Sequence, residues 1–164
     1  EIGFSVRLPE SVPAISRAGV EIPLAPGLEE ISCYGRGPEE NYCDRKLAAR
    51  LQVWESTVTA QHFPFSPPSE TGGHEDARWL ELRGEGGCFR AEADRPFHFD
   101  VRHHAAADYR AAHDHEMPLR QESWLHIDAA HGPIGSDMAW STGMPAEYRL
   151  PGGEYALTFR LEIR

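Results

Sequence analysis

Apolar and polar residues alternate along much of this chain with a period of two. The pattern is clear at residues 1–8 (EIGFSVRL), 97–102 (FHFDVR), 124–129 (WLHIDA) and 155–163 (YALTFRLEI). Alternation of this kind predicts β-strands that bury one face and expose the other, as in antiparallel sheets. We therefore expect the apolar side chains of these segments to form the core and their polar neighbours to face water.

The alternation assigns each strand residue to a face. The expected core side chains are Ile2, Phe4, Val6, Leu8, Phe97, Phe99, Val101, Leu125, Ile127, Ala129, Tyr155, Leu157, Phe159, Leu161 and Ile163. The expected solvent-facing side chains include His98, Asp100, Arg102, Trp124, His126 and Asp128. This second group mixes charges of both signs, which suits a wet sheet face.

Turn residues separate the alternating segments. Glycines at 84–87 and the Pro-Gly-Gly sequence at 151–153 each predict a hairpin, the second one joining AEYRL to EYALTF. Residues 61–76 are rich in proline and glycine and predict a long irregular loop. Only 105–113 has helix-forming composition. The sequence predicts one all-β domain over residues 1–164, an antiparallel β-sandwich of roughly ten strands.

Composition narrows the function classes. The chain has 16 Lys and Arg against 26 Asp and Glu, a formal net charge of −10, which disfavours nucleic-acid binding. We find neither a signal peptide nor an apolar run of about 18 residues, so no membrane partner is expected. The three cysteines, Cys33, Cys43 and Cys88, form no CxxC pair. We therefore expect free thiols and a cytoplasmic location.

Histidines are the first candidates for chemistry. His103 and His104 are adjacent, and His113 and His115 would point the same way on a strand. Two imidazoles are fewer than the three or four protein ligands of a zinc site. Polar surface histidines around a loop remain the simpler interpretation, so no metal ligand is assigned.

The carboxylates give no catalytic residue from sequence alone. Acidic neighbours such as Glu39–Glu40 do not show which side chains converge in space, and no nucleophile elbow or phosphate-binding loop is present. Trp140 is more informative, because it lies in the Gly- and Pro-rich segment 131–145. A tryptophan there either fills an edge of the core or offers a flat face to a ligand such as a sugar.

Several motifs resemble those of one enzyme family. YGRGPEENYCDRK, residues 34–46, resembles the (L/Y)G-x-GP-x-ENY-x-DR signature of the C-terminal, small-chain-type domain (domain 5) of bacterial Lac-type β-galactosidases, glycoside hydrolase family 2. FSPPSETGG (65–73), WLHIDAAHGPIGSDMAWS (124–141) and the final YALTFRL resemble further family segments in the same order. The resemblance covers nearly the whole chain.

The resemblance implies a β-supersandwich of the galactose mutarotase-like kind, partial here because the family's domain is larger. The chain would then be the C-terminal segment of an enzyme that hydrolyses terminal β-D-galactosides. Both catalytic glutamates of the family lie on a TIM barrel outside this chain. Trp140 matches the family tryptophan that stacks on the acceptor sugar. The change to Met138-Ala139 before it departs from the family's usual Asp-Ser.

The resemblance also carries expectations about partners and ions. The remaining domains of the same polypeptide, a galactoside or acceptor sugar, and further copies in a homo-oligomer are the implied partners. Magnesium and sodium are implied for the full-length enzyme on other domains, and no cofactor is assigned to this segment.

Residues 34–46 are then expected to support the sheets rather than perform chemistry, with docking against the barrel as the alternative. Glycines would permit positive φ angles, and Pro38 would fix a turn. Asn41 and Asp44 would cap backbone groups, and Arg45 would pair with a carboxylate. The candidate carboxylates are those of Glu39, Glu40 and Asp44.

Two other functions stay open at this stage. A stand-alone carbohydrate-binding or mutarotase-like module would bring a histidine and a glutamate together in a cleft. His103, His113 and His115 are the candidate histidines. A purely structural oligomerisation domain is the third possibility.

Overall fold

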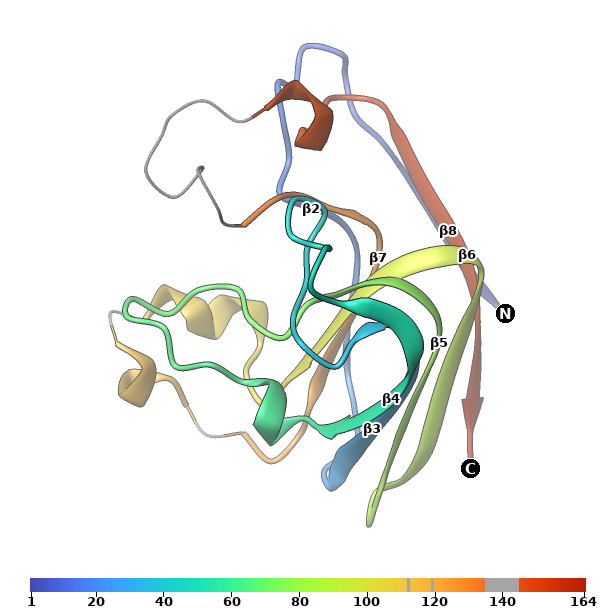
Figure 1. The fold of residues 1–164 in the computed structure, drawn as a ribbon, viewed down its shortest axis with the longest axis vertical. Coiled ribbons are helices and arrows are strands. Elements are labelled where there is room, and N and C mark those ends of the chain that lie inside the picture. Colours follow the sequence, from blue (N-terminus) through green and yellow to red (C-terminus); the bar gives the residue numbers. More distant parts are fainter. Residues whose placement is uncertain (112, 119, 135–144) are drawn as a thin grey trace.

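The computed structural model of the chain describes residues 1–111, 113–118, 120–134 and 145–164. Within these residues the fold is all-β, with one open antiparallel sheet of eight strands and only short 3-10 turns (Figure 1). The predicted fold class is therefore confirmed. No helix of the described residues is long and apolar enough to cross a bilayer.

The strand order follows one path with a branch at β6. The strands are β1 (Ile2–Arg7), β2 (Arg17–Pro23), β3 (Leu28–Gly37), β4 (Arg50–Thr57), β5 (His74–Gly84), β6 (Gly87–Arg102), β7 (Trp124–His131) and β8 (Glu154–Ile163). They pair in the order β1-β8-β6-β5-β3-β4, while β7 pairs with β6 and β2 pairs with β7. The 3-10 turns are η1 (Thr59–Gln61), η2 (Ala106–Arg110), η3 (Asp114–Glu116) and η5 (Ala146–Tyr148).

The long strand β6 organises the sheet. Its first half, from Phe89 to Ala93, pairs with β8, and its second half, from His98 to Arg102, pairs with β7. The sheet curves strongly, and the connections after β3, β4 and β6 gather on the side away from both termini (Figure 1). Curvature lets one open sheet enclose a core between its own parts, much as two sheets do in a sandwich.

The core matches the predicted apolar faces. Phe97, Phe99 and Val101 of β6 pack in one cluster with Leu125 of β7 and Leu157 of β8. The remaining buried members of the cluster are Leu24, Leu28, Ile31, Cys33, Trp54, Val58, Ala77, Leu80, Leu82, Phe89, Ala91, Ile127 and Phe159. Burial of this apolar surface is the main favourable term for the fold.

Strand β1 departs from the prediction. Ile2 is 46% exposed and Val6 is 38% exposed, although both were expected in the core. Among the described residues β1 pairs only with β8, and β4 pairs only with β3, so each forms an outer edge of the sheet. Phe4 of β1 and Trp54 of β4 still pack against the core, while the free backbone groups of an edge strand can accept another strand. Ile163, at the end of β8, was also expected in the core and is 80% exposed.

The described residues form eight strands rather than the expected ten or so, for two reasons. The segments around 88–93 and 97–102 were expected as separate strands, but β6 runs through both. The expected hairpin at 151–153 is wrong, because its first arm is the 3-10 turn η5, and Ile15 pairs with Leu150 instead. The hairpin at 84–87 is confirmed.

Replacement of a core leucine provides a test of this packing. Leu80 is fully buried in β5, so we expect Leu80→Ala to lower the free energy of unfolding by about 2–5 kcal/mol. The matched control is Leu47→Ala, because Leu47 is fully exposed and its loss should change stability by less than about 0.5 kcal/mol. Denaturant unfolding followed by tryptophan fluorescence measures both values, and equal effects would contradict the core assignment.

Candidate functional site

The polar face formed by the end of β6 and by β7 is buried beside the polar residues of β2, contrary to the prediction that it would be wet. We call this set of side chains the charged face, and its members are Arg17, Glu21, His98, Asp100, Arg102, His126 and Asp128. The five members on β6 and β7 are almost completely removed from solvent. Buried charges are costly unless they are paired, so the pairing of this face decides what it can do.

Arg17 is the central cation of the charged face. Its Nη2 atom lies 2.8 Å from Oδ2 of Asp100 and 2.5 Å from Oδ2 of Asp128. Its other amino nitrogen, Nη1, lies 3.6 Å from Oε1 of Glu70, which belongs to the loop between η1 and β5. One guanidinium therefore joins three carboxylates from two strands and a loop.

Arg102 extends the same network. Its Nε atom lies 2.7 Å from Oδ1 of Asp100, and its Nη1 donates a 3.0 Å hydrogen bond to Glu70. The guanidinium also lies over the ring of Tyr109, 4.7 Å from its centroid. Glu70 thus bridges Arg17 and Arg102 from the loop side, which fastens the loop to the sheet.

The histidines of the charged face bond to the same carboxylates. Nδ1 of His98 lies 3.0 Å from Oδ2 of Asp128, and Nδ1 of His126 lies 2.9 Å from Oδ1 of Asp100. On its other side, His126 places Nε2 3.3 Å from Oε1 of Glu21. Each buried carboxylate therefore contacts one histidine and at least one arginine.

These contacts fix the ionisation states. Burial alone would raise the pKa of Asp100, but the positive charges of Arg102 and Arg17 hold it well below its ordinary value. Burial opposes the same shift at Asp128, where the hydrogen bond from His98 and the charge of Arg17 lower the pKa. The carboxylates also raise the pKa of Arg17 against the effect of burial. Asp100, Asp128 and Arg17 are thus charged near neutral pH.

A cluster of rings covers one end of the charged face. Tyr42 packs against His98 and His131, with centroids 5.8 Å and 5.4 Å away, and the two histidine rings stack at 4.3 Å. Burial, with the nearby charges of His98 and Arg17, lowers the pKa of His131 to about 3. The N–H of Gly73 donates a 3.1 Å hydrogen bond to the Tyr42 hydroxyl.

The structure explains residues 34–46 as a support, as the sequence predicted. Asn41 is fully buried; its amide donates to the carbonyls of Arg36 and Glu39 and its Oδ1 accepts the N–H of Glu75. Arg45 pairs with Glu40 through a single 2.5 Å contact. The hydrogen bond between Asn41 and Glu75 ties residues 34–46 to the start of β5.

The expected role of the glycines in this segment is wrong in detail. Gly35 and Gly37 belong to β3, and neither is among the described glycines with positive φ. They are required for close approach, because a Cβ at Gly37 would overlap the indole of Trp54 and one at Gly35 would crowd Ala77. Gly35 and Gly37 are therefore needed because they have no side chain to obstruct packing, and not because a turn requires them.

Trp140, the predicted sugar-binding residue, lies outside the described residues. The backbone that leads toward it leaves from the end of β7, beside the ring cluster. There the N–H of Gly132 donates a 2.7 Å hydrogen bond to the carbonyl of Ser16, and Nδ1 of His131 lies 2.7 Å from the Gly132 carbonyl. The Ser16 carbonyl and the ring of His131 therefore anchor the described base of this segment.

The charged face does not suit a metal ion, although three of its donors are close. Ligand atoms of His98, Asp100 and Asp128 lie within 4.8 Å of one another. Arg17 already contacts both carboxylates and supplies the positive charge that an ion would bring. Magnesium prefers near-octahedral oxygen ligands and keeps several waters, for which this buried, paired group leaves no room.

The predicted histidine group divides between different partners. His103 contacts Glu29 at 2.9 Å, whereas Nδ1 of His104 donates to the carbonyl of Pro118. His113 and His115 stack on each other, with centroids 5.4 Å apart. His103 and Glu29 touch directly, so they do not face each other across a space for a ligand.

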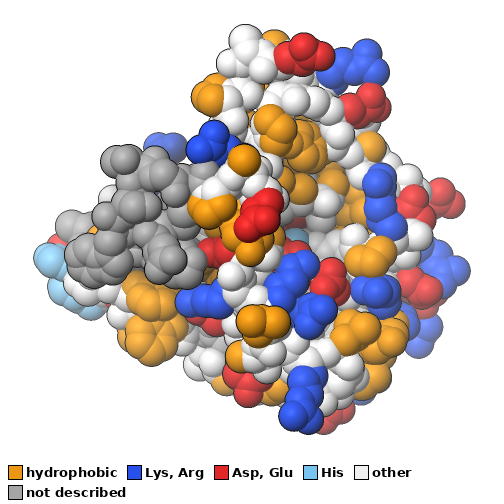
Figure 2. Space-filling model, turned by 45° about the horizontal axis from the view of Figure 1, so that its top comes forward, with side chains coloured by type: hydrophobic (Ala, Val, Ile, Leu, Met, Phe, Trp, Pro, Cys, Tyr) orange, Lys and Arg blue, Asp and Glu red, His pale blue; other side chains and the backbone are white. Residues whose placement is uncertain are grey.

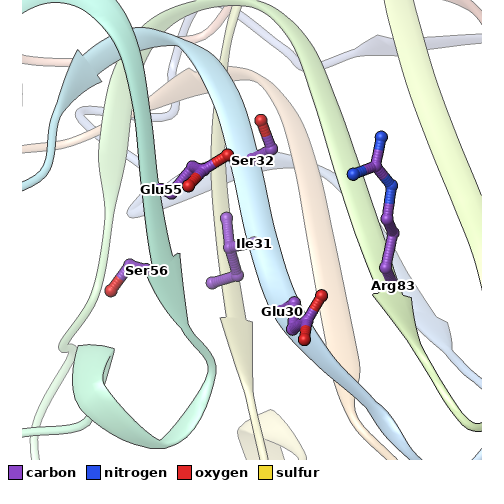
Figure 3. A pocket seen from close by; sticks show the side chains of 6 residues that line it. All are labelled: Glu30, Ile31, Ser32, Glu55, Ser56 and Arg83. Carbon is purple, nitrogen blue, oxygen red and sulfur yellow. The ribbon is translucent and has the colours of Figure 1, made fainter.

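A shallow hollow lies on the outer face of β3, β4 and β5. Glu30, Ser32, Glu55 and Arg83 line it (Figure 3). Figure 3 shows Ser32 and Glu55 close together while Arg83 stands apart on its own strand. The groups do not converge on one point, so this hollow has no evident chemistry. Figure 2 likewise shows acidic and basic side chains interspersed on the face in view, rather than gathered by sign.

Comparison with known proteins identifies the family. The family model described as "Beta galactosidase small chain" matches residues 1–161. The chain belongs to this family. The β-galactosidase of Aeromonas hydrophila is 35% identical over 162 residues, which cover 94% of this chain and 15% of that protein. "Beta-galactosidase 2" of Enterobacter cloacae is 33% identical over 158 residues, which cover 95% and 15%.

A third relative has the same extent. The β-galactosidase of Vibrio cholerae is 32% identical over 165 residues, which cover 99% of this chain and 16% of the relative. The chain thus spans about one sixth of the length of these β-galactosidases. The resemblance inferred from the four motifs is confirmed, and the chain corresponds to one part of a larger polypeptide.

The sequence did contain a signal for the charged face that alternation alone does not reveal. In residues 98–102 of β6 and 126–128 of β7, the alternate polar residues are His, Asp and Arg, with no Lys, Ser or Thr among them. Arginine, carboxylate and imidazole are the groups that pair well when water is excluded. A strand face made only of such groups is therefore a candidate for burial.

Removal of the central cation should be costly. Arg17→Met leaves Asp100 and Asp128 without their shared guanidinium, so we expect a loss of about 3–5 kcal/mol of stability. The control is Arg7→Met, because Arg7 forms a solvent-exposed pair with Glu154 and should contribute less than about 1 kcal/mol. Urea unfolding of both variants at neutral pH measures the difference. Similar small losses would mean that Arg17 does not hold the charged face together.

Acid should destabilise this domain in two stages. His74 and His131 have pKa values of about 3 in the fold against 6.5 for an ordinary histidine, mainly because both are buried. As pH falls from about 6.5 toward 3, the unfolded chain binds protons that the folded chain does not, so stability decreases by up to about 1.4 kcal/mol per pH unit for each histidine. The lowered pKa values of Asp100 and Asp128 add a further loss below about pH 4.

The variant His131→Phe tests the first stage. It keeps a ring against Tyr42 and removes one titrating group, so its stability should fall less steeply between about pH 6.5 and 4 than that of the parent chain. Urea midpoints across this range give the slopes. Parallel slopes would show that His131 does not remain neutral in the fold.

Proposed function

We propose that this chain is the C-terminal segment of a retaining β-galactosidase that hydrolyses terminal β-D-galactosides such as lactose. The observation that carries the proposal is the family match over residues 1–161, together with relatives that are about six times longer. In this proposal the catalytic glutamates lie in the other five sixths of the polypeptide, on a TIM barrel, and the segment itself is not catalytic.

The ionisation of the charged face supports a non-catalytic role. Glycoside hydrolysis needs two carboxyl groups on either side of the scissile bond, one of them with a raised pKa so that it can donate a proton. Asp100 and Asp128 are shielded from solvent, shared by Arg17, and have lowered pKa values. Carboxylates in this state serve as structural anions.

Trp140 is proposed to contribute to the acceptor subsite. Its ring would stack on the glucose or other acceptor bound beyond the galactose, since the apolar C–H face of a sugar matches the flat indole surface. The support is its place in the motif 124–141 and the anchoring of the segment's base at Gly132 and His131. The departure at Met138 and Ala139 alters the polar neighbours of the ring and leaves the ring itself.

The partners and setting complete the proposal. The segment is proposed to pack against the barrel and to help assemble a homo-oligomer in the cytoplasm. The open outer edges of β1 and β4 and the exposed residues Leu51 and Val53 on β4 are consistent with contacts to other parts of the assembly. Magnesium and sodium, when bound by the full-length enzyme, are proposed to use ligands on other domains.

A stand-alone carbohydrate-binding or mutarotase-like module is the competing proposal. It would need an imidazole and a carboxylate that both face a sugar. In the described residues His98, His103 and His126 each contact a carboxylate directly. An imidazole and a carboxylate that bond to each other do not both face a sugar, which favours the β-galactosidase proposal.

The substitution Trp140→Ala in the full-length enzyme tests the role of the ring. Loss of one stacking contact should weaken acceptor binding by roughly five- to tenfold and lower the ratio of transglycosylation to hydrolysis. Cleavage of an activated aryl galactoside should remain nearly normal, because its leaving group needs no acceptor contact.

The conservative variant Trp140→Phe is the control, since it keeps an aromatic face and should retain part of the acceptor binding. Unchanged partitioning in Trp140→Ala, accompanied by a lower melting temperature, would show that the ring only fills a core edge.

A further inference from the structure

A surface cleft beside residues 34–46 contains no member of the charged face. Its volume is about 410 Å³, within the range of small-molecule pockets, which is about 300–1,000 Å³. The lining residues that matter here are Glu39, Glu40, Gln61, Phe63, Phe65 and Thr71. They come from two loops that the sequence separates but that the fold brings together.

Two phenylalanine rings form the apolar wall of this cleft. Phe63 is 58% exposed, and its ring centroid lies 4.5 Å from that of Phe65. Exposure of one large aromatic ring is ordinary, but two rings in contact at the wall of a cleft present a continuous flat surface. Such a surface fits a ligand with an apolar face.

The aromatic wall is held in place by the backbone. The N–H of Phe63 donates a 3.0 Å hydrogen bond to Oγ1 of Thr71, and the N–H of Phe65 donates to the carbonyl of Phe63. The side chain of Gln61 donates to the carbonyl of Pro38, which joins the two loops. A pre-organised wall loses little conformational entropy when a ligand binds.

Carboxylates provide the polar wall. The carboxylate of Glu39 is exposed and has no ion pair or hydrogen bond with the described part of the chain. Glu40 is fixed at Oε1 by Arg45 and at Oε2 by the N–H of Gly72 and the hydroxyl of Tyr42, which leaves a lone pair on Oε1 beside the oxygens of Glu39. These oxygens can accept hydrogen bonds from hydroxyl groups, and hydrogen bonds to a charged acceptor are the stronger kind.

The chemistry of the two walls selects the ligand class. No Lys or Arg is among the lining residues, the lining His62 is bonded to Asp114, and Arg45 nearby is paired with Glu40, so a phosphate or carboxylate ligand would face Glu39 and Glu40 without an unpaired Lys or Arg to bind it. A neutral ring with one apolar face and several hydroxyl donors satisfies both walls. We propose that this cleft is a saccharide-binding subsite, in which Phe63 and Phe65 stack on a sugar ring and Glu39 and Glu40 accept its hydroxyl hydrogens.

This subsite extends the proposed function without depending on Trp140. In an enzyme that acts on galactosides, it would hold a further sugar unit of a longer substrate or a product sugar. An organic cation is the other ligand that aromatic rings and carboxylates attract. The experiment must therefore compare a sugar with a cation.

Hydroxyl-radical footprinting of the full-length polypeptide tests the subsite residue by residue. The probes are D-galactose, D-glucose and a thio-linked galactoside that is not hydrolysed, with tetramethylammonium as the cationic probe. Phe63 and Phe65 should be oxidised without ligand, and saturating sugar should reduce their oxidation at least about twofold. Tyr34, exposed on the outer face of β3, is the internal control and should not change.

Variants connect protection to the carboxylate. Glu39→Gln should weaken the apparent sugar affinity about three- to tenfold, since it replaces a charged acceptor by a neutral one. Glu10→Gln is the matched control, because Glu10 is exposed and far from this cleft in the fold. Trp140→Ala should leave the footprint at Phe63 intact.

Three outcomes would overturn the subsite. In the first, sugar does not change the oxidation of Phe63 and Phe65. In the second, both residues are protected from oxidation before any ligand is added. In the third, tetramethylammonium protects them and no sugar does. The second outcome would mean that another domain covers the cleft. Failure of the Trp140 proposal would instead appear as unchanged acceptor partitioning in Trp140→Ala, so the two proposals are judged by different readouts.

Discussion

The guanidinium of Arg17, held between the carboxylates of Asp100 and Asp128, is the interaction on which the rest of this domain depends. It brings together strands β2, β6 and β7, and through Glu70 it also holds the loop before β5. Without a cation at this point, two buried carboxylates on neighbouring strands would repel each other in a medium of low polarizability. A sheet face that should favour water is thus converted into an interior surface.

The two faces of the sheet consequently have different structural roles. The apolar cluster around Phe99 stabilises the sheet from one side, and the charged face fixes the loops on the other. Because the ionic groups are paired with one another, they are poorly suited to proton transfer but well suited to holding loop geometry. In the two proposals made above, ligand recognition belongs instead to Trp140 and to the cleft beside Phe63.

The sequence predicted well what depends on local periodicity. The alternation at Phe97, Phe99 and Leu125 identified the core, and the motifs identified the family. Prediction from the sequence failed where contacts between distant segments determine the structure. The 151–153 hairpin did not form, because Gly152 donates its N–H to the carbonyl of Val12 and Ile15 bridges Leu150. Alternation alone likewise did not predict the burial of Asp100, since it requires Arg17 from a strand more than eighty residues earlier.

Gly73 has an implication for how this domain can change over time. It belongs to the FSPPSETGG motif, and a Cβ there would overlap the ring of Tyr42 and approach Nε2 of His98 to 2.7 Å. Its N–H also caps the Tyr42 hydroxyl. The motif at 65–73 and the motif at 34–46, which contains Tyr42, therefore pack against each other and depend on each other. A larger residue at 73 becomes tolerable only after the tyrosine has been lost, so the order of substitutions is constrained. Either motif transferred alone into another protein would lack the residues against which it packs.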